Sequence, residues 1–395
     1  MATIGIFTVK KLCYHQGHYY TYGGFGDYLS AMRQRFERVV LVAHVKELEP
    51  PQGHYVIPAG ADLSVVWLPQ VRTELGTWLW LPYVMWKAWV ATEQMDVVHA
   101  RMPNHTGLVG AWACKLRRKP LFIQVIADWH LQAQQMPARR KGGLGLLMKG
   151  HLYLYDWLER MTCRGQLVFA QGESCYAKHA QTANCDLVLS SSHRIHDIRL
   201  PTPKFTGANK RILNVARLTG IKNQALILRA LAELRRTDPS WSLTLVGEGP
   251  LMGELRALAQ QLGISEAVTL VGQVGRGESL WRFFDEADCF VLSSHSEGTP
   301  KVLLEAMARG LPVIATAVGG VPSTVAHEQR GLLFPSDDVQ ELVLALRRMD
   351  VEVDLRTRMA HQASEFARLH TVDGATDAMV KRVVSQWPQL AGSKR

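Results

Sequence analysis

The sequence predicts an α/β protein made of two doubly wound parallel sheets, and three observations support this fold class. Short runs rich in β-branched residues alternate with longer helical stretches along the chain, which is typical of βαβ units. At 395 residues, of which 47% are hydrophobic, the chain is longer than one compact core usually supports, so two domains are expected. A segment at residues 201–210 with two prolines and Gly207 separates the two sets of runs.

The first domain is expected to span residues 1–203. Its strands are predicted where the β-branched runs lie, at residues 4–9, 39–44, 64–69, 96–101, 120–126, 166–171 and 186–192. The opening run lacks the basic start, apolar middle and small-residue cleavage site of a signal peptide. We therefore interpret it as the first strand.

A glycine cluster follows this first strand. Gly23, Gly24 and Gly26 precede an expected helix and would let the backbone approach a phosphate, although a plain turn is the alternative. A dinucleotide-binding fingerprint is excluded, because about 15 residues separate the strand end near Val9 from Gly24, and Leu29 takes the place of the third glycine.

The second domain is expected to span residues 204–370. Its predicted strands lie at residues 211–217, 242–249, 267–272, 288–294, 312–320 and 331–336, with helical sequence such as residues 223–236 between them. Residues 371–390 have a helical pattern, and we expect this helix to pack back on the first domain. Ligands of such sheets bind beyond the carboxyl ends of the strands, so the loops after the strands are the places to look for function.

The charge distribution limits the classes of binding partner, and the cysteine spacing bears on metal binding. Residues 1–203 carry 22 lysines and arginines against 14 acidic residues, a net +8, whereas residues 204–395 carry 23 against 21. An anionic partner would therefore meet the first half, with nucleic acid, anionic lipid or mere solubility left open by charge alone. The six cysteines form no CxxC pair, which indicates reduced thiols and no zinc site.

Two segments could contact a membrane, and both have an ordinary alternative. The apolar stretch at residues 77–91 is too short to span a bilayer and contains Pro82 and Lys87. We favour core packing for its tryptophans, Trp78, Trp80, Trp86 and Trp89, over a helix lying on a membrane. For the basic run at residues 139–141 we favour a solvated loop. The expected location is cytoplasmic, at most peripheral to the inner face of a membrane.

The most informative local signal spans residues 293–320. A strand is followed by a polar loop, by Thr299 and Pro300 as an expected N-cap and first-turn pair, and by a helix that ends at Gly310. The amino end of this helix would face the ligand cleft, where its N–H groups and dipole can hold an anion such as a diphosphate.

Four charged side chains accompany this helix end. Glu297 precedes the helix and Glu305 lies roughly 8 Å further along its axis, so the two carboxylates could grip two parts of an elongated ligand. Arg217 and Lys222 follow an earlier strand and suit a diphosphate. The alternative for each of the four is an ordinary solvated surface charge.

These residues fall into a recognisable set of motifs. RLxxxK at 217–222, GEGP at 247–250 and EGTPKVLLE at 297–305, followed by EAMARGLPVIAT and a GG pair, resemble the family-4 retaining glycosyltransferases of GT-B fold, also called glycosyl transferases group 1. The resemblance is specific over residues 211–345. It implies two Rossmann-like doubly wound domains facing a central cleft, with the acceptor bound by the first domain and a nucleotide-sugar donor by the second.

The resemblance also implies roles for individual residues. Arg217 and Lys222 would bind the donor diphosphate and Glu297 would contact the transferred sugar, so these three are the expected catalytic residues. Glu305 would hold the ribose hydroxyls, and the backbone near Val274 would meet the base. The remaining expected donor-binding residues are Gly24, Gly247, Gly298, Thr299, Pro300, Lys301 and Val302.

This chain departs from the family pattern at three places. EGTP stands where EGFG is common, so Pro300 removes one backbone donor, and Ser323 stands where a glutamate is common. The strand ending in QVIAD lacks the histidine found in many members, which leaves Asp128 or His130 as the expected residues on the acceptor or sugar side.

The expected function is a retaining glycosyltransferase that moves a sugar from a nucleotide diphosphate donor, UDP-linked, to an acceptor hydroxyl in glycan, lipopolysaccharide or glycosylated-metabolite synthesis. The acceptor would be a glycan, a lipid-linked molecule or a small molecule, and nucleic acid is not an expected partner. No cofactor is expected, and no metal, because the sequence contains no Asp-x-Asp element. The alternatives are a nucleotide-sugar epimerase or hydrolase of the same fold, and a non-catalytic nucleotide-sugar or membrane-binding module.

Overall fold

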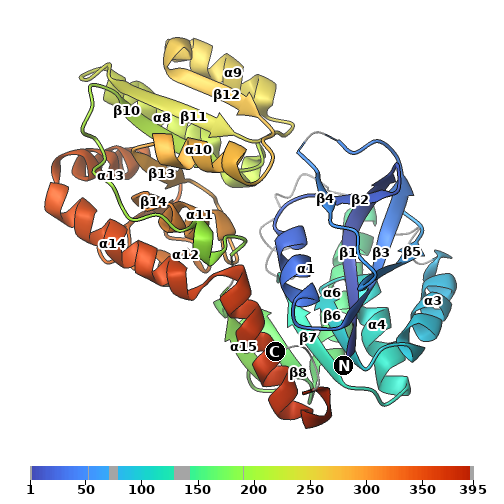
Figure 1. Cartoon of the computed structure of the whole chain (residues 1–395). Coiled ribbons are helices and arrows are strands. Elements are labelled where there is room, and N and C mark those ends of the chain that lie inside the picture. Colours follow the sequence, from blue (N-terminus) through green and yellow to red (C-terminus); the bar gives the residue numbers. More distant parts are fainter. Residues whose placement is uncertain (1, 52, 71–78, 129–142, 190, 392–395) are drawn as a thin grey trace. The chain divides into compact units, whose positions relative to one another are not determined.

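The computed structural model describes residues 2–51, 53–70, 79–128, 143–189 and 191–391 (Figure 1). His130, Trp78 and the basic run at 139–141 lie outside these residues. The chain divides into two compact units, one formed by Met1–Leu189 with Asp373–Arg395 and the other by Ser190–Val372.

The division falls before the boundary expected at residues 203/204, because residues 191–203 bond to helices of the second unit. The Ser192 hydroxyl donates to Glu305 Oε1 over 2.6 Å, and the Arg199 N–H donates to the Ala308 carbonyl over 2.8 Å. The proline-containing segment therefore belongs to the second unit and does not link the two.

The first unit contains a nine-stranded sheet. Seven parallel strands run in the order β5-β3-β1-β6-β7-β8-β9, with β1 inside and later strands added on both sides. Their bounds are β1 Thr3–His15, β3 Arg38–Glu47, β5 Leu63–Leu68, β6 Val97–Met102, β7 Leu121–Val125, β8 Leu167–Gln171 and β9 Asn184–Val188. This is the doubly wound topology that the sequence predicts.

The first strand is longer than predicted. It was expected to end near Val9, but β1 continues to His15 because Lys11–Tyr14 pair with His44–Glu47 of β3 after a register shift. A two-residue turn, in which Gln16 and Gly17 both have positive φ, then starts β2 (His18–Thr21), which pairs antiparallel with β1 and with β4 (Tyr55–Ile57). The expected strand end was wrong, because the pairing that extends the strand lies far away in sequence.

Six helices accompany this sheet in the described part of the chain. They are α1 Phe25–Arg33, α3 Leu81–Glu93, α4 His105–Leu116, α6 Gly143–Cys163, α7 Glu173–His179 and the C-terminal α15 Val372–Gln386, with the 3-10 turn η4 Pro388–Leu390 after it. Helix α15, drawn in red in Figure 1, is held by Arg35, whose Nε lies 2.7 Å from Asp377 Oδ1, and by Arg382, whose Nε lies 3.2 Å from Asp186 Oδ2.

The tryptophan-rich helix does not pack in the core as favoured. The buried residues of α3 are Val84, Ala88, Ala91 and Thr92, whereas Trp80, Trp86 and Trp89 are 45%, 57% and 41% exposed. The small residues recur at helical spacing and pack against α4, so the bulky rings occupy the opposite face. Hydrophobic content alone did not show which face is buried.

The second unit contains a six-stranded parallel sheet in the order β12-β11-β10-β13-β14-β15. The strands are β10 Lys210–Val215, β11 Trp241–Val246, β12 Val268–Gly272, β13 Cys289–Leu292, β14 Val313–Thr316 and β15 Leu332–Phe334. The strand order reverses between β10 and β13. The carboxyl ends of these two strands are the switch point at which such sheets bind ligands.

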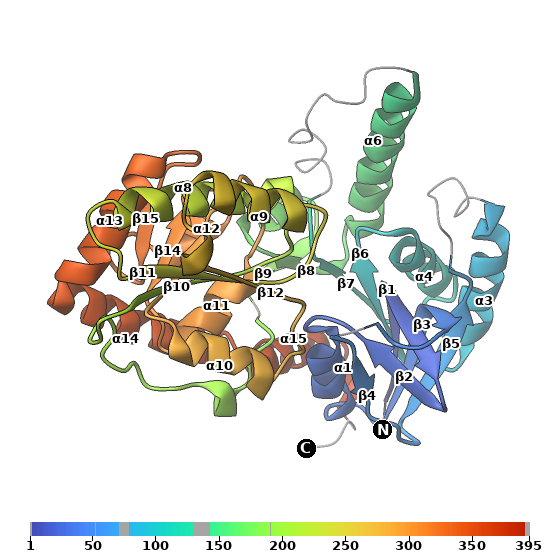
Figure 2. The same cartoon turned by 90° about the horizontal axis from the view of Figure 1, so that it is seen from above.

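Helices cover both faces of this sheet (Figure 2). They are α8 Gln224–Arg235, α9 Met252–Gln261, α10 Glu278–Glu286, α11 Lys301–Ala308, α12 Val321–Val325, α13 Val339–Val351 and α14 Val353–Leu369, with 3-10 turns η1 Ile195–Asp197, η2 Gly220–Lys222 and η3 Ser265–Ala267. Helices α8, α9 and α13 line one core and α10, α11 and α12 the other.

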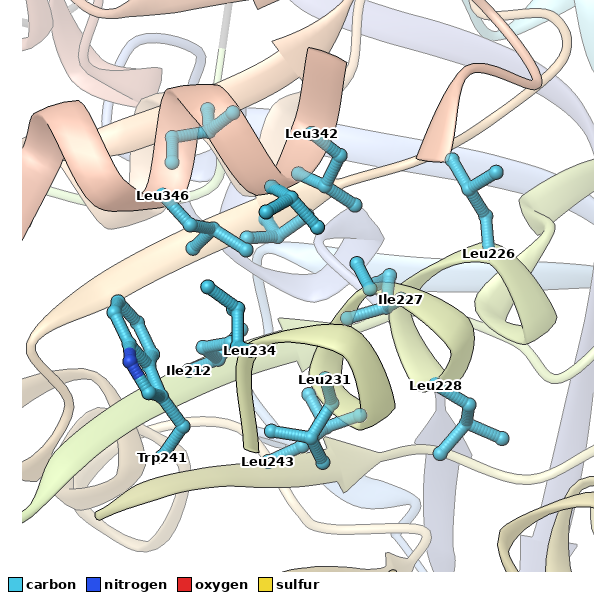
Figure 3. Packing of buried hydrophobic residues seen from close by; sticks show 14 of the residues in the cluster. Ile212, Leu226, Ile227, Leu228, Leu231, Leu234, Trp241, Leu243, Leu342 and Leu346 are labelled. Atoms are coloured by element: carbon cyan, nitrogen blue, oxygen red, sulfur yellow. The ribbon is translucent and has the colours of Figure 1, made fainter. Parts of the chain in front are cut away.

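Neighbouring residues of one strand pack into opposite cores, one on each face of the sheet. On β10, Ile212 packs with α8 and α13 while Leu213 packs with α10 and α11. Figure 3 shows the first of these cores, in which Leu231 of α8 and Leu346 of α13 lie with Ile212. The period of two explains why strands buried on both faces appear in the sequence as continuous apolar runs.

Candidate functional site

The loops that follow β10 and β13 are bonded to each other at the switch point of the second sheet. The Ser293 hydroxyl lies 3.0 Å from the Lys222 carbonyl and 2.9 Å from the Asn223 carbonyl, and the His295 N–H donates to the Ile221 carbonyl over 2.8 Å. Asn223 adopts the left-handed conformation, with φ 47°, directly before α8 begins at Gln224. These bonds fix the turn that carries Lys222.

Lys222 and Glu297, two predicted catalytic residues, form an ion pair. Lys222 Nζ lies 2.5 Å from Glu297 Oε1, and the Ser294 hydroxyl donates to the same oxygen over 2.6 Å. Both side chains are largely shielded from solvent. Because both bonds use Oε1, Oε2 of Glu297 has no hydrogen-bond partner among the residues that the structure describes.

Arg217, the third predicted catalytic residue, is exposed just after β10. Its carbonyl accepts a 3.1 Å hydrogen bond from the buried Gln224 side chain, which fixes the backbone beneath it. Within the described part of the chain, no carboxylate forms an ion pair with its guanidinium. This leaves Arg217 as a cation able to meet an anionic ligand.

Two glycines hold the Glu297 loop against the turn after β14. A Cβ atom on Gly319 would lie 1.9 Å from the Glu297 carbonyl oxygen, and one on Gly320 would lie 2.1 Å from that of Gly298. Gly319 also has a φ of +52°, a conformation that side chains other than glycine adopt at a cost. Only a residue without Cβ permits this backbone approach.

Gly247 also permits a close approach between two backbone segments, here at the ends of neighbouring strands. Its φ is +135° and an added Cβ would lie 2.1 Å from the Ala216 carbonyl oxygen, while its N–H donates to Gly272 over 2.8 Å. Gly247 therefore aligns the loops after β10, β11 and β12. Val274, two residues beyond β12, is half-buried against the core of α10 and α11.

The predicted cap of the next helix is wrong. Helix α11 begins at Lys301, and the N-cap position falls on Pro300, whose ψ of 99° is extended and whose side chain makes no cap bond. Thr299 does not cap either, because its buried Oγ1 has no hydrogen-bond partner. The loop is tied down at Glu297 and Gly298, so the chain turns into the helix only after Pro300. Val302, in the first turn, packs partly against the core.

Glu305 lies inside the protein and not on a solvated helix face. It is 4% exposed, and its Oε1 accepts hydrogen bonds from the Ser192 hydroxyl over 2.6 Å and from Arg276 Nη2 over 3.0 Å. Burial alone would raise the pKa of Glu305, but the charge of Arg276 and these two bonds outweigh it and hold the pKa below its ordinary value. Glu305 is therefore a buried carboxylate in its ionised form.

Ser192 and Arg276 were not predicted. Ser192 is the last residue of the strand expected at 186–192, and Arg276 follows the strand expected at 267–272. Their positions at or after strand ends were the available signal, but nothing local in the sequence shows that both side chains reach Glu305.

A family model matches the segment that carries this geometry. Residues 201–366 match the family Glycosyl transferases group 1. The resemblance seen in residues 211–345 is thereby confirmed for this segment, which lies within the second unit.

Curated relatives match over similar lengths. The amylovoran biosynthesis glycosyltransferase AmsK of Erwinia amylovora is 36% identical over 145 residues, 35% of this chain and 35% of its own length. A D-inositol 3-phosphate glycosyltransferase of Saccharomonospora viridis is 34% identical over 173 residues, 42% of this chain and 40% of its own length. The chain thus spans less than half the length of these relatives.

Solved structures match over nearly the whole chain. Sucrose-phosphate synthase from Thermosynechococcus elongatus gives a TM-score of 0.74 at 19% identity, over 98% of this chain and 100% of that one. Anabaena HepE in complex with UDP-glucose gives a TM-score of 0.68 at 18% identity with the same coverage. At these identities the likeness shows the fold, and it confirms the predicted α/β class with two parallel-sheet domains of the GT-B type.

The first unit holds two further residues that the sequence predicts for the site. Gly24 occupies the N-cap position of α1 and has no side chain to cap it. Asp128 follows β7, accepts a 3.1 Å hydrogen bond from the Ser174 hydroxyl and lies 4.0 Å from Lys178 Nζ. Lys178 also pairs with Asp156 and Glu159, so Asp128 borders a polar cluster of its own unit.

No group of three histidine, cysteine, aspartate or glutamate side chains in the described residues is placed to hold a metal ion. The six cysteines are all free thiols, five of them buried.

The close approach at Gly319 generates a test of the site's framework. We expect Gly319→Ala to lower the free energy of unfolding by about 2 kcal/mol, because the new methyl group overlaps the Glu297 carbonyl and the backbone conformation is strained. Thermal unfolding would measure it.

Gly253 provides the matched control for this substitution. It is exposed in α9 and has no atom within 4 Å of an added Cβ, so Gly253→Ala should be neutral or slightly stabilising. Equal melting temperatures for the two variants would contradict a required contact at Gly319.

Proposed function

We propose that the chain is a retaining glycosyltransferase that moves a sugar from a UDP-linked donor to an acceptor hydroxyl in polysaccharide or glycolipid synthesis. The observation that carries the proposal is the Lys222–Glu297 pair beside Arg217, at the switch point of the sheet that matches the glycosyl transferases group 1. A UDP-linked donor is supported by Anabaena HepE, a protein of the same fold solved with UDP-glucose. Polysaccharide synthesis is supported by AmsK, named for amylovoran biosynthesis.

The two cations would hold the donor diphosphate. Arg217 has no acidic partner in the described residues, and Lys222, which is paired with Glu297, would also contact the diphosphate. Together with the amino end of α11, they would stabilise the negative charge that develops on the leaving diphosphate, which is usually the largest catalytic contribution in such a site.

The two carboxylates would contact different parts of the donor. Oε2 of Glu297 is available to a hydroxyl of the transferred sugar, while Oε1 is held by Lys222 and Ser294. The hydrogen bonds that Glu305 receives from Ser192 and Arg276 both use Oε1, which leaves Oε2 to accept from the ribose hydroxyls. On this mechanism the departing phosphate oxygen takes the acceptor proton on the same face of the sugar, so no strong side-chain base is needed.

The separate roles of the two acids provide the main test of the function. We expect Glu297→Ala to lose transfer while binding UDP like the unmodified protein, because its contact is with the sugar. Glu305→Ala should weaken UDP binding about tenfold or more, since it removes hydrogen bonds to a charged acceptor. Calorimetric titration with UDP and product formation from the UDP-sugar with the largest thermal shift would measure the two effects.

Two controls keep this test interpretable. Glu254→Ala removes an exposed acid from the first turn of α9 and should leave both properties unchanged. Glu305→Gln, which can still bond to Ser192, checks for a folding defect. Full transfer by Glu297→Ala would remove that residue from the site. Donor consumption that yields free sugar or an epimer, without acceptor product, would instead indicate a hydrolase or epimerase, and the absence of any UDP binding would indicate a module of another kind.

We further propose that transfer needs no divalent metal. Arg217 and Lys222 supply positive charge where metal-dependent enzymes place a cation, and the sequence contains no Asp-x-Asp element. Activity should therefore persist after exhaustive chelation. A loss that added magnesium or manganese restores would show that the diphosphate is neutralised by a metal.

Attachment to the inner face of an anionic membrane is also proposed, on the exposed rings of the first unit. Trp86 of α3 and Trp157 of α6 are each 57% exposed, and Lys87 Nζ lies 5.4 Å from the Trp86 ring centroid. Helix α6 extends away from its own sheet (Figure 2). Aromatic rings beside cations suit the interfacial region of a bilayer. None of the described helices combines the length and apolar character that crossing a membrane requires.

Vesicle binding tests this attachment. The protein should sediment with phosphatidylglycerol vesicles at low salt and dissociate as the ionic strength rises, because salt screens surface attraction. Replacing Trp86 and Trp157 together by glutamine should weaken the binding about tenfold, since two exposed rings can then no longer enter the interfacial region of the bilayer. Leu369→Gln changes an exposed apolar residue of the second unit and serves as the control. Equal binding by both variants would contradict the role of these two tryptophans.

A further inference from the structure

The first unit contains a buried arginine whose charge has no acidic partner. Arg101, on β6, is 7% exposed, and its Nε and Nη1 atoms make no hydrogen bond to any residue that the structure describes. Its guanidinium carbon lies 4.6 Å from the Tyr28 ring centroid and 5.2 Å from that of Phe25. Ring contacts of this kind are weaker than the cost of burying a guanidinium without hydrogen bonds. The Nε and Nη1 donors of Arg101 therefore lack the hydrogen-bond acceptor that a bound ligand could supply.

A second cation lies nearby. Phe7 of β1 pairs with Ala100 of β6, so Lys10 and Arg101 both lie just beyond the paired ends of these adjacent strands. Burial lowers the pKa of Lys10, and the charge of Arg101 lowers it further. Lys10 Nζ lies 4.4 Å from the ring centroid of Tyr22, the residue just before the glycine cluster. Among the described residues, no carboxylate forms an ion pair with Arg101 or Lys10. The two positive charges thus lie together without compensation.

The amino end of α1 faces the same place. Phe25 and Tyr28, whose rings contact Arg101, belong to its first turn, and Gly24 at the N-cap position supplies no side-chain hydrogen bond. Tyr55 fixes the preceding loop, because its hydroxyl donates to the Gly23 carbonyl over 2.6 Å and accepts from the Gly26 N–H over 2.7 Å. An added Cβ on Gly23 would meet nothing within 4 Å, so space is open beside the loop. The positive end of the helix dipole adds to the two cations.

The neighbouring strand contributes another unpaired polar group. Gln124 of β7 is the register partner of Arg101, so the two side chains share one face of the sheet. Gln124 is buried, and its Oε1 has no hydrogen-bond partner. Buried polar groups in proteins are nearly always bonded. The unpaired amide oxygen needs a donor, whereas the unpaired guanidinium N–H groups need an acceptor, so Arg101 is the group that indicates an anionic ligand.

We propose that Arg101, Lys10 and the amino end of α1 bind a phosphate group of the acceptor. This inference rests on the proposed function, in which Arg217 and Lys222 of the second unit already match the charge of the donor diphosphate. Two cations and a helix dipole suit a dianion, and the planar guanidinium can make two parallel bonds to phosphate oxygens. Gly24, predicted to face the donor, is here assigned to the acceptor.

The test uses the full chain saturated with UDP, so that inorganic phosphate, the probe, cannot occupy the donor site. Phosphate affinity is measured calorimetrically for the unmodified protein, Lys10→Gln, Arg101→Gln and Lys11→Gln. We expect the first two variants to bind phosphate at least tenfold more weakly and to bind UDP unchanged. The exposed Lys11 is the matched control, and Lys11→Gln should bind phosphate like the unmodified protein.

The stability of Arg101→Gln gives a second readout. Without phosphate, removal of an uncompensated buried charge should leave the melting temperature unchanged or higher, whereas a purely structural arginine would lower it. Lys10 is only half-buried, so Lys10→Gln keeps the proposal testable if Arg101→Gln does not fold.

Three outcomes would overturn the proposal. Unchanged phosphate affinity in both variants would remove the site, as would equal weakening in Lys11→Gln. A parallel loss of UDP affinity would assign the cluster to the donor diphosphate. If UDP fails to bind the unmodified protein, the proposed function fails on its own, and phosphate titration of the Lys10 and Lys11 variants still reports whether the first unit holds an anion.

Discussion

The candidate site depends on how closely the backbone turns approach one another at the carboxyl edge of the second sheet. Gly319 and Gly320 lie against the carbonyls of Glu297 and Gly298, and Gly247 lies against that of Ala216. These contacts leave no room for a methyl group, so the loops after β10, β11, β13 and β14 hold one relative arrangement. Lys222 and Glu297 meet because the turns that carry them are fixed in this way.

The fold could be predicted because its signals are local and repeated. Each strand of the second sheet appears as an apolar run, since both of its faces are buried, and each loop after a strand contains glycine, serine or a charge. The placement of Lys222 and Glu297 at one edge of the sheet could be predicted from the topology, which brings the carboxyl ends of parallel strands together. Their ion pair was not predicted.

The features that were missed depend on contacts distant in sequence. The extension of β1 to His15 depends on pairing with β3, and the exposed face of α3 is set by small residues that fit against α4. Ser192 and Arg276 reach Glu305 across 113 and 29 positions of sequence. Thr299 resembled an N-cap because local preferences favour it, yet the constraint on Glu297 and Gly298 moved the helix start to Lys301.

The packing of α15 on the first unit affects the order in which the two units fold during synthesis. The second unit is one continuous segment, but the first unit is completed only by residues from Asp373 onward. During synthesis from the amino end, Arg35 cannot form its ion pair with Asp377 until the whole second unit has emerged from the ribosome. The second unit can thus mature while the first still exposes the surface that α15 will cover, a period in which a chaperone has the greatest opportunity to act.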